Sequence, residues 1–204
     1  YLPKDFAGKR ILEMTDLMSK NYNQIIKSYS LFNPLKYIYF LEKYLVKKYE
    51  IYCESYFDKI VLASKNDLKN FHLYRSKKFI EVPNTINIKK SIYRYKKSNN
   101  IILFMGNLNY LPNKDACINF SKNILPKLNK IYSNIEFHIV GEINSIDKIF
   151  FYSIKKTYVH GPLKNVDQII KKSICGICNV EIATGTQMKM LTYMGYGLPC
   201  VSSD

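Results

Sequence analysis

The residues best suited to bind a ligand lie in one loop near the end of the sequence. Residues 184–187 read TGTQ, after an apolar run and before a helical segment. A hydroxyl followed three residues later by Gln fits a capping box, which predicts that a helix begins at Gly185. Its free backbone N–H groups, with Lys189 in the first turn, would bind a phosphate. The alternative is an ordinary capped helix with a solvated lysine.

The histidines give no sign of acid–base catalysis. His72, His138 and His160 are isolated in the sequence, and none forms a nucleophile–base pair. His138 lies in an apolar run and is interpreted as a packed core residue. His160 precedes Gly161 at the end of a predicted strand, so it is the histidine placed for a ligand, although a structural role is an equal alternative.

Four other polar residues have open roles. Asp16 and Ser19 lie in a segment that could border a cleft, where a structural and a functional role are equal alternatives. Glu42 and Glu50 lie on a long amphipathic helix, and we interpret them as part of its solvated face.

The cysteines indicate a reducing compartment without a disulfide framework, since they are odd in number and scattered. They are Cys53, Cys117, Cys175, Cys178 and Cys200. Cys175 and Cys178 form a CxxC pair within the apolar run ICGIC, with no second pair and no His nearby. This context favours a buried strand over a redox or zinc site, so no metal site is expected.

Composition predicts a soluble globular protein of one large or two small domains. The 204 residues are 47% hydrophobic, with no apolar run long enough to span a membrane and no signal peptide. Tyr1 is not an initiator methionine, so we expect that the start is missing. The expected location is the cytoplasm, including the inner face of the membrane.

The formal charge of +15 comes almost entirely from lysine, with three arginines, Arg10, Arg75 and Arg94. Proteins that read bases rely on the arginine fork, so no specific nucleic-acid partner is expected. The abundance of Asn, Ile and Tyr points to AT-rich codons as the source of the lysine. What remains is a weak attraction to polyanions or to an anionic membrane.

The first half of the sequence predicts alternating strands and helices. Their ranges are a strand over 11–17, a helix over 33–53, a strand over 59–63 and a helix over 67–73. In the long helix an apolar stripe recurs every three or four residues, formed by Leu35, Ile38, Leu41, Leu45 and Tyr49. Pro34 suits its first turn. A polar segment over 88–99 predicts a domain boundary.

The second half predicts a parallel sheet covered on both faces. Apolar runs without alternation end near Gly and are separated by helices. The predicted strands are 101–105, 137–140, one near 158–159, 174–180 and 200–202, with helices beginning at Pro112 and covering 167–172. Ligands bind beyond the carboxyl ends of such strands. The loops at Gly106, Gly141, Gly161 and Thr184 should therefore line one cleft.

The segments FMGNLNYLPNKDA, FHIVG, VHGPL and TGTQMKMLTYMGYGLPCVSS occur in this order. Together they resemble the C-terminal domain of a GT-B glycosyltransferase of the family 4 type, closest to the bacterial branch that makes cell-surface polysaccharides. MTDLMSKNY, FDKIVLASKNDL and VPNTIN resemble the end of that family's N-terminal domain and its crossover. The resemblance implies an α/β fold of two Rossmann-like domains. The first ends at residue 87, residues 88–99 link them, and residues 100–204 form a truncated donor domain.

The resemblance also implies a nucleotide-diphosphate sugar as donor substrate, no cofactor, and a saccharide or lipid-linked acceptor. Gly106 and Asn107 would approach the phosphates, where a residue without Cβ allows close contact. Gly161 and Pro162 would lie near the base. The diphosphate would be bound by Thr184, Gly185, Thr186 and Lys189, and the ribose by Thr192. The resemblance also implies a transfer that retains the configuration of the sugar and needs no metal, with electrostatic stabilisation of the leaving diphosphate.

Three departures from the family pattern bear on activity. The paired glutamates, eight positions apart, fall on Thr184 and Thr192, and a threonine still donates one hydrogen bond but does not replace a carboxylate. The Gly-Asp after the crossover asparagine reads Thr85-Ile86-Asn87. Finally, the sequence lacks the N-terminal Gly-rich loop, the acceptor pocket and the closing helix, so the fragment alone is expected to be inactive.

Three alternatives remain open. A nucleotide-sugar epimerase of the same architecture would need carboxylates and a His from the absent part. A polyanion-binding module would show a continuous basic face across the cleft. An inactive relative is favoured by the Thr192 substitution.

Overall fold

The structure is a computed structural model that describes residues 6–14, 16–64, 67, 77–86, 88, 93–181 and 187–203. The chain forms two compact units. The first runs from the N-terminus to Asn84, and the second takes up Thr85–Glu181 and Gln187–Asp204. The described residues 93–99 hydrogen-bond within the second unit, where Tyr93 N donates to Tyr196 O and Asn99 Nδ2 to Ser173 O.

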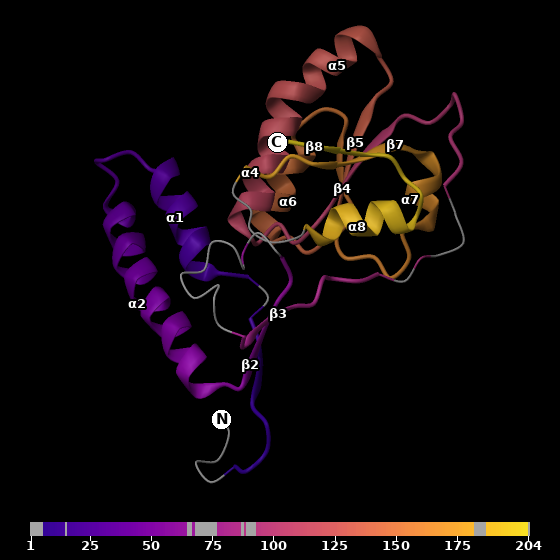
Figure 1. Ribbon diagram of the computed structural model, residues 1–204. Coiled ribbons are helices and arrows are strands. Elements are labelled where there is room, and N and C mark those ends of the chain that lie inside the picture. Colours follow the sequence, from indigo (N-terminus) through magenta and orange to yellow (C-terminus); the bar gives the residue numbers. More distant parts are fainter. Residues whose placement is uncertain are drawn as a thin grey trace. The chain divides into compact units, whose positions relative to one another are not determined.

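The first unit contains a small parallel sheet and a helical hairpin. The strands are β1 (Ile11–Glu13), β2 (Lys59–Leu62) and β3 (Phe79–Glu81), in the order β1-β2-β3. The helices α1 (Met18–Ser28) and α2 (Pro34–Tyr56) pack side by side (Figure 1). β1 is shorter than the strand predicted over 11–17, because Leu17 is the N-cap of α1 and the end of that range leads into the helix. Of the helix predicted over 67–73, which includes His72, only Asp67 is among the described residues.

Helix α2 begins as predicted, with Pro34 in its first turn and Asn33 Oδ1 accepting from Leu35 N. The side that packs on α1 is mostly polar, although Tyr39 also packs on Tyr22 with ring centroids 5.5 Å apart. Ser19 Oγ donates to Glu50 Oε2 at 2.6 Å, and Lys43 Nζ donates to Asn23 Oδ1 at 2.8 Å. Glu50 is only 3% exposed, so its interpretation as a solvated residue is wrong. Its carboxylate is retained in the interior because Ser19 provides two hydrogen-bond donors, one from N–H and one from Oγ.

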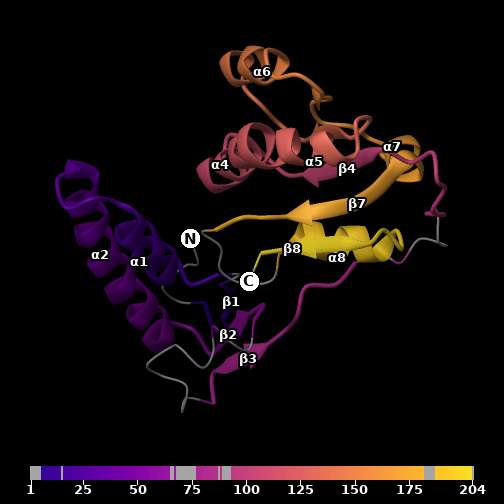
Figure 2. The same cartoon turned by 90° about the horizontal axis from the view of Figure 1, so that it is seen from above.

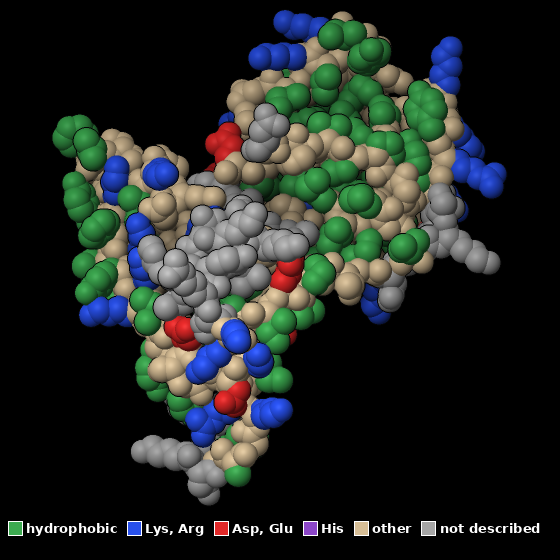
Figure 3. All heavy atoms as spheres, viewed as in Figure 1, with side chains coloured by type: hydrophobic (Ala, Val, Ile, Leu, Met, Phe, Trp, Pro, Cys, Tyr) green, Lys and Arg blue, Asp and Glu red, His purple; other side chains and the backbone are tan. Residues whose placement is uncertain are grey.

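The apolar stripe of α2 faces away from the hairpin. Its five members are between 46% and 65% exposed: Leu35, Ile38, Leu41, Leu45 and Tyr49. Figure 3 shows hydrophobic side chains along this outer side. An amphipathic pattern predicts the helix but does not determine which face meets its neighbour. Here the polar face is the one that packs.

The second unit is a five-stranded parallel sheet in the order β6-β5-β4-β7-β8. The strands are β4 (Ile101–Met105), β5 (Glu136–Val140), β6 (Thr157–Val159), β7 (Ser173–Cys178) and β8 (Cys200–Ser202). The helices are α4 (Leu111–Asn119), α5 (Leu125–Ile131), α6 (Ser145–Tyr152), α7 (Asp167–Lys172) and α8 (Met188–Gly195). The register of β4 on β5 runs from Ile101↔Glu136 to Met105↔Val140. The predicted parallel sheet is confirmed.

Helices cover both faces of this sheet. On one face Ile170 of α7 and Tyr193 of α8 pack against Leu103 and Val140. On the other, Phe120 lies 4.5 Å from Phe137 between ring centroids. Figure 2 shows α4 and α5 on one side of β7 and α8 on the other. Strands covered on both faces explain why the sequence shows continuous apolar runs.

Two predicted helices differ from the structure. The helix that begins near Pro112 is interrupted by a π-turn, Phe120–Ile124, before α5. Pro126 has no N–H to continue the α-helical ladder, which accounts for the interruption. Helix α8 begins at Met188 rather than Gly185, because Gln187 has an extended backbone (ψ 104°) and makes no side-chain cap. The predicted capping box needs Gln187 within the helix, so that prediction is wrong.

Candidate functional site

Three glycines meet at the carboxyl edge of the second sheet. Gly106 follows β4, Gly141 follows β5, and Gly161 lies just after β6. Gly106 N donates to Val140 O, and Gly141 N donates to Gly161 O, both at 2.9 Å. A Cβ on Gly141 would lie 1.9 Å from Gly106 O. These three glycines therefore lie together at one edge of the sheet, whereas Thr184, Gly185 and Thr186 lie outside the described residues. The single cleft expected from the sequence stays a prediction.

A pocket of about 360 Å³ opens at this edge, beside the end of β4 and the start of α8. We call it the Lys189 pocket. Its lining includes three residues predicted from the sequence, Gly106, Lys189 and Thr192. The other lining residues are Met105, Tyr110, Asn113, Gln187 and Met188. None of the described lining residues is a carboxylate or a histidine, so the ionic character of the lining comes from lysine.

Lys189 is held within the pocket rather than solvated. Its Nζ donates to Asn113 Oδ1 at 3.0 Å and lies 5.0 Å from the centroid of the Phe104 ring. Burial lowers the pKa of the Lys189 ammonium, because desolvation disfavours the charged form. A bound anion would favour the charged form again. This residue is thus a partly desolvated cation at the N-terminus of α8, where the helix dipole also favours negative charge.

Tyr193 fixes α8 on the sheet. Its ring lies over Gly176, where an added Cβ would meet the ring at 2.5 Å. The phenol oxygen accepts from Met105 N at 2.8 Å and lies 3.3 Å from Leu103 O, to which it donates. Tyr193 is fully buried. One helix turn separates Tyr193 from Lys189, so the same contact sets the position of the lysine relative to the end of β4.

The family model described as Glycosyl transferases group 1 matches residues 99–204, which is more than half of the chain. The chain belongs to this family. None of the curated proteins matches the chain.

Solved structures with the same fold include three carbohydrate-related proteins. A mutant of S. aureus TarM in complex with Fondaparinux, alpha-GlcNAc-glycerol and UDP gives a TM-score of 0.66 at 13% identity, covering 95% of this chain and 36% of its own. Anabaena Alr3699/HepE in complex with UDP and glucose gives a TM-score of 0.60 at 10% identity, and the match covers 94% of this chain and 52% of that protein.

The pneumococcal O-GlcNAc transferase GtfA in complex with UDP and GlcNAc gives a TM-score of 0.60 at 13% identity, and the match covers 78% of this chain and 32% of that protein. These likenesses confirm the predicted α/β fold of GT-B type. The chain spans about a third to a half of the length of these neighbours.

Asn107, Gly161 and Pro162, which the glycosyltransferase resemblance also indicated, do not line the pocket. Asn107 holds its own loop, since its Oδ1 accepts from Asn109 N and its Nδ2 donates to Glu142 Oε2. Gly161 has a left-handed φ of 70° and, with Pro162, belongs to the loop that follows β6. Thr192 lines the pocket, but its hydroxyl donates to Met188 O at 2.8 Å. It therefore retains only acceptor capacity for a ligand.

Asn113 is the main lining residue that sequence reasoning missed. The PNK sequence indicated a helix start, and nothing in the sequence distinguished this Asn from an exposed one. In the structure it is 8% exposed and contacts Lys189, which is 76 positions away in sequence. The pair forms only because the first turns of α4 and α8, on opposite faces of the sheet, meet at its carboxyl edge.

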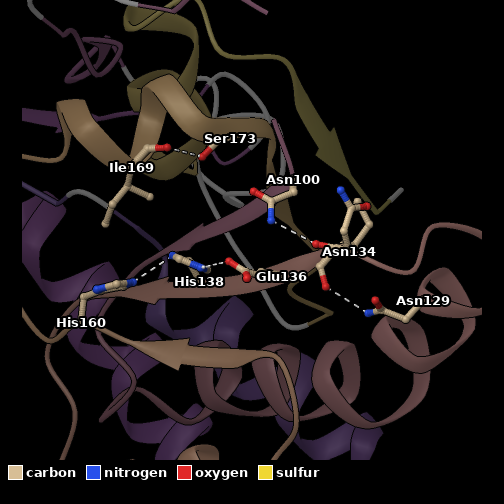
Figure 4. Close-up of polar contacts among 9 residues, drawn as sticks. Asn100, Asn129, Asn134, Glu136, His138, His160, Ile169 and Ser173 are labelled. Carbon is tan, nitrogen blue, oxygen red and sulfur yellow. Dashed lines mark hydrogen bonds and ion pairs between the residues drawn. The ribbon is translucent and has the colours of Figure 1, made fainter. Parts of the chain in front are cut away.

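A second pocket, of about 400 Å³, contains the two histidines of the second unit. Figure 4 shows His160, His138 and Glu136 in a row along β5. His138 Nε2 lies 3.1 Å from Glu136 Oε2, and its Nδ1 lies 3.0 Å from His160 Nε2. The description of these histidines as isolated is wrong, because strand pairing brings them together.

Both ring nitrogens of His138 are paired in this row, Nε2 with the Glu136 carboxyl and Nδ1 with His160 Nε2. Burial lowers the pKa of both His138 and His160, which favours their neutral forms. His138 thus finds its hydrogen-bond partners within the protein, which supports the interpretation of His138 as a packed residue. The His160 ring is directed to β5 and does not line the Lys189 pocket.

Cys175 and Cys178 lie in strand β7 as predicted, and both are free thiols. Burial raises the pKa of Cys175 to about 11, so it is a poor nucleophile and metal ligand. Within the described ranges no group of three or more His, Cys, Asp or Glu side chains is placed to hold a metal ion. Nor does any helix in those ranges have the length and apolar character needed to cross a membrane.

Proposed function

We propose that this chain forms the donor side of an enzyme that transfers a sugar from a nucleotide diphosphate to a saccharide or lipid-linked acceptor. Surface polysaccharide synthesis in the cytoplasm, at the inner face of the membrane, is the proposed setting. The observation that carries the proposal is the Lys189 pocket, in which a partly buried ammonium, a helix N-terminus and Gly106 meet at the carboxyl edge of a parallel sheet. UDP in the complexes of the structural neighbours agrees with a nucleotide ligand.

The proposed chemistry is electrostatic. As the bond between the anomeric carbon and the β-phosphate oxygen breaks, the electron pair moves to the diphosphate and negative charge develops on its oxygens. Lys189 Nζ and the N–H groups in the first turn of α8 are placed to stabilise this charge. We propose retention of configuration and no requirement for a metal, as the family resemblance implies. A group that activates the acceptor would come from outside the described lining of this pocket.

Calorimetric titration with UDP, GDP and ADP, followed by their sugar derivatives, tests the proposal. We expect saturable binding of one nucleoside diphosphate at one site. Absence of binding by any nucleotide would favour the inactive relative. Competition by heparin alone would favour the polyanion-binding module. Conversion of the bound sugar without an acceptor, followed by NMR, would favour the epimerase.

Replacing Thr192 by Glu should strengthen nucleotide binding by about 1–2 kcal/mol, since hydrogen bonds to a charged group exceed neutral ones by that order. The Thr192 hydroxyl already donates to Met188 O, whereas a carboxylate accepts from two ribose hydroxyls. Calorimetry gives the affinity, and Thr192→Gln separates the charge from the longer side chain. Weaker binding by Thr192→Glu would mean that the pocket is shaped around threonine.

We also propose that the outer face of α2 contacts an anionic membrane. Its exposed apolar stripe is accompanied by the exposed Lys48, whereas Lys36 and Lys43 of the same helix donate to Tyr29 O and Asn23 Oδ1 on the α1 side. Apolar contact combined with attraction to anionic lipid is the behaviour of interfacial helices. Replacing Ile38, Leu41 and Leu45 by Ser should lower partition into phosphatidylglycerol-containing vesicles at least about tenfold, because three large apolar side chains lose burial.

Co-sedimentation with vesicles measures this partition. The control replaces three exposed apolar residues of the second unit by Ser, namely Ile131, Ile146 and Ile149. Equal losses in both variants, or equal binding to neutral phosphatidylcholine vesicles, would contradict a specific role for α2.

A further inference from the structure

One buried amide joins the segments that form the Lys189 pocket. Asn113, on α4, accepts from Lys189 Nζ through Oδ1 at 3.0 Å. Its Nδ2 donates to Asn107 O at 2.9 Å. Its backbone N donates to Tyr110 O at 3.1 Å. A Cβ on Gly106 would lie 3.0 Å from Asn113 Nδ2, so the amide also packs tightly on the loop after β4. Asn113 therefore connects the β4–α4 loop with helix α8.

The chemistry of an amide suits this place for two reasons. Burial disfavours the charged form of Lys189, and a neutral acceptor offsets part of that cost without cancelling the positive charge. A carboxylate would neutralise the ammonium and leave little attraction for an anion. The NH₂ group of the amide donates a hydrogen bond to the Asn107 carbonyl oxygen. This oxygen carries a partial negative charge that would otherwise repel a phosphate.

We propose that Asn113 is a positioning residue that holds the Lys189 ammonium in the pocket as a full positive charge for the donor diphosphate. It acts through Lys189 and the Asn107 carbonyl and does not itself carry out a chemical step. The identity of the ligand rests on the proposed function. The coupling between Asn113 and Lys189 rests on their contact and is measurable without a ligand.

The decisive variant is Asn113→Asp, which preserves size and exchanges the NH₂ group for oxygen. At pH 7.5 we expect its dissociation constant for the nucleoside diphosphate to rise about 10- to 100-fold, the effect of one charge-assisted hydrogen bond. A protonated carboxyl has one O–H donor and a carbonyl acceptor, the two functions that the Asn113 amide uses here. The ratio of variant to wild-type dissociation constants should therefore fall towards one as the introduced carboxyl takes up a proton, at or below about pH 4, because the neighbouring ammonium favours the charged carboxylate.

Two further variants separate positioning from general structural damage. Asn113→Leu removes both hydrogen bonds without adding charge, so it should weaken binding with no recovery at low pH. Asn119→Asp places the same charge on the same helix, where the native side chain pairs with Asn123, and should leave binding unchanged. Thermal melting shows whether each variant is folded. A pH-independent loss in Asn113→Asp, equal to that in Asn113→Leu, would overturn the proposal.

NMR titration of the lysine ammonium groups gives the ligand-free test, with Lys189→Met identifying the Lys189 signal. The pKa of Lys189 should be higher in Asn113→Asp than in the wild type, because a carboxylate favours the charged form. An unchanged titration would overturn the positioning role whatever the nucleotide data show. A raised pKa in a protein that binds no nucleotide would support the coupling and would count against the proposed function instead.

Discussion

Nucleoside-diphosphate binding should weaken by about 1.5–3 kcal/mol when Lys189 is replaced by Met, the range for a charge-assisted hydrogen bond. Lys189 is the cation among the described lining residues, and its ammonium is already partly desolvated. A diphosphate therefore gains more from this contact than from a solvated lysine. Methionine preserves most of the side-chain stem over the Phe104 ring, so the change isolates the charge. Calorimetry on both proteins at one salt concentration measures the difference.

Lys122→Met is the matched control. Lys122 also lies over an aromatic ring, with Nζ 4.8 Å from the Phe150 centroid, but it is outside the pocket. Its loss tests whether the general positive charge of the protein accounts for the affinity. If Lys189→Met binds as tightly as the wild type, the backbone amides suffice or the nucleotide binds elsewhere.

The same lysine predicts a pH dependence. Burial lowers the pKa of Lys189, so its ammonium loses the proton at lower pH than an exposed lysine does. Nucleotide affinity should therefore fall as the solution is made alkaline, and the fall should be absent in Lys189→Met.

Gly141→Ala should destabilise the second unit by about 3 kcal/mol or more, since backbone strain and overpacking add. Gly141 has a φ of 148°, and an added Cβ would lie 1.9 Å from Gly106 O and 2.6 Å from Gly106 C. Both neighbours are backbone atoms of Gly106 at the end of β4, so neither yields as a flexible side chain would. Urea denaturation followed by circular dichroism measures the free energy of unfolding.

Gly161→Ala provides the comparison. Gly161 also has a positive φ, 70°, but a Cβ there would meet nothing within 4 Å. Its cost should be only that of a left-handed residue, about 1–2 kcal/mol. Equal losses in the two variants would mean that the close approach of Gly141 to Gly106 has no energetic consequence.

Local sequence patterns were sufficient for most elements of the second unit. Helix α7 has the bounds that were predicted, and β4 and β8 also agree with their apolar runs. These elements follow from nearby residues, since an uninterrupted apolar run describes a strand covered on both faces. The start of α8 was misplaced because Gln187 matches a capping box in sequence while its backbone is extended. A cap is decided by backbone torsions that tertiary contacts can override.

Helix α1 and helix α6 were absent from the sequence prediction. The signal for α6 was present, because Asn144 Oδ1 accepts from Asp147 N in the manner of an N-cap. Helix α1 has no side-chain cap at Leu17, so its start carries no comparable signal. Its packing on α2 includes the Ser19–Glu50 hydrogen bond, between residues 31 positions apart, and the contact of Tyr22 with Tyr39.

The sequence by itself determined the parallel α/β sheet of the second unit, the glycines at its carboxyl edge and the presence of Lys189 at the start of a helix. All of these follow from composition and spacing within a few residues. Only the tertiary structure decided that Asn113 holds Lys189, that His138 pairs with His160, and that the polar face of α2 packs inward. Each of these depends on contacts between elements distant in sequence. Side-chain hydrogen bonds across such distances form only after the strands and helices have packed, so no local pattern encodes them.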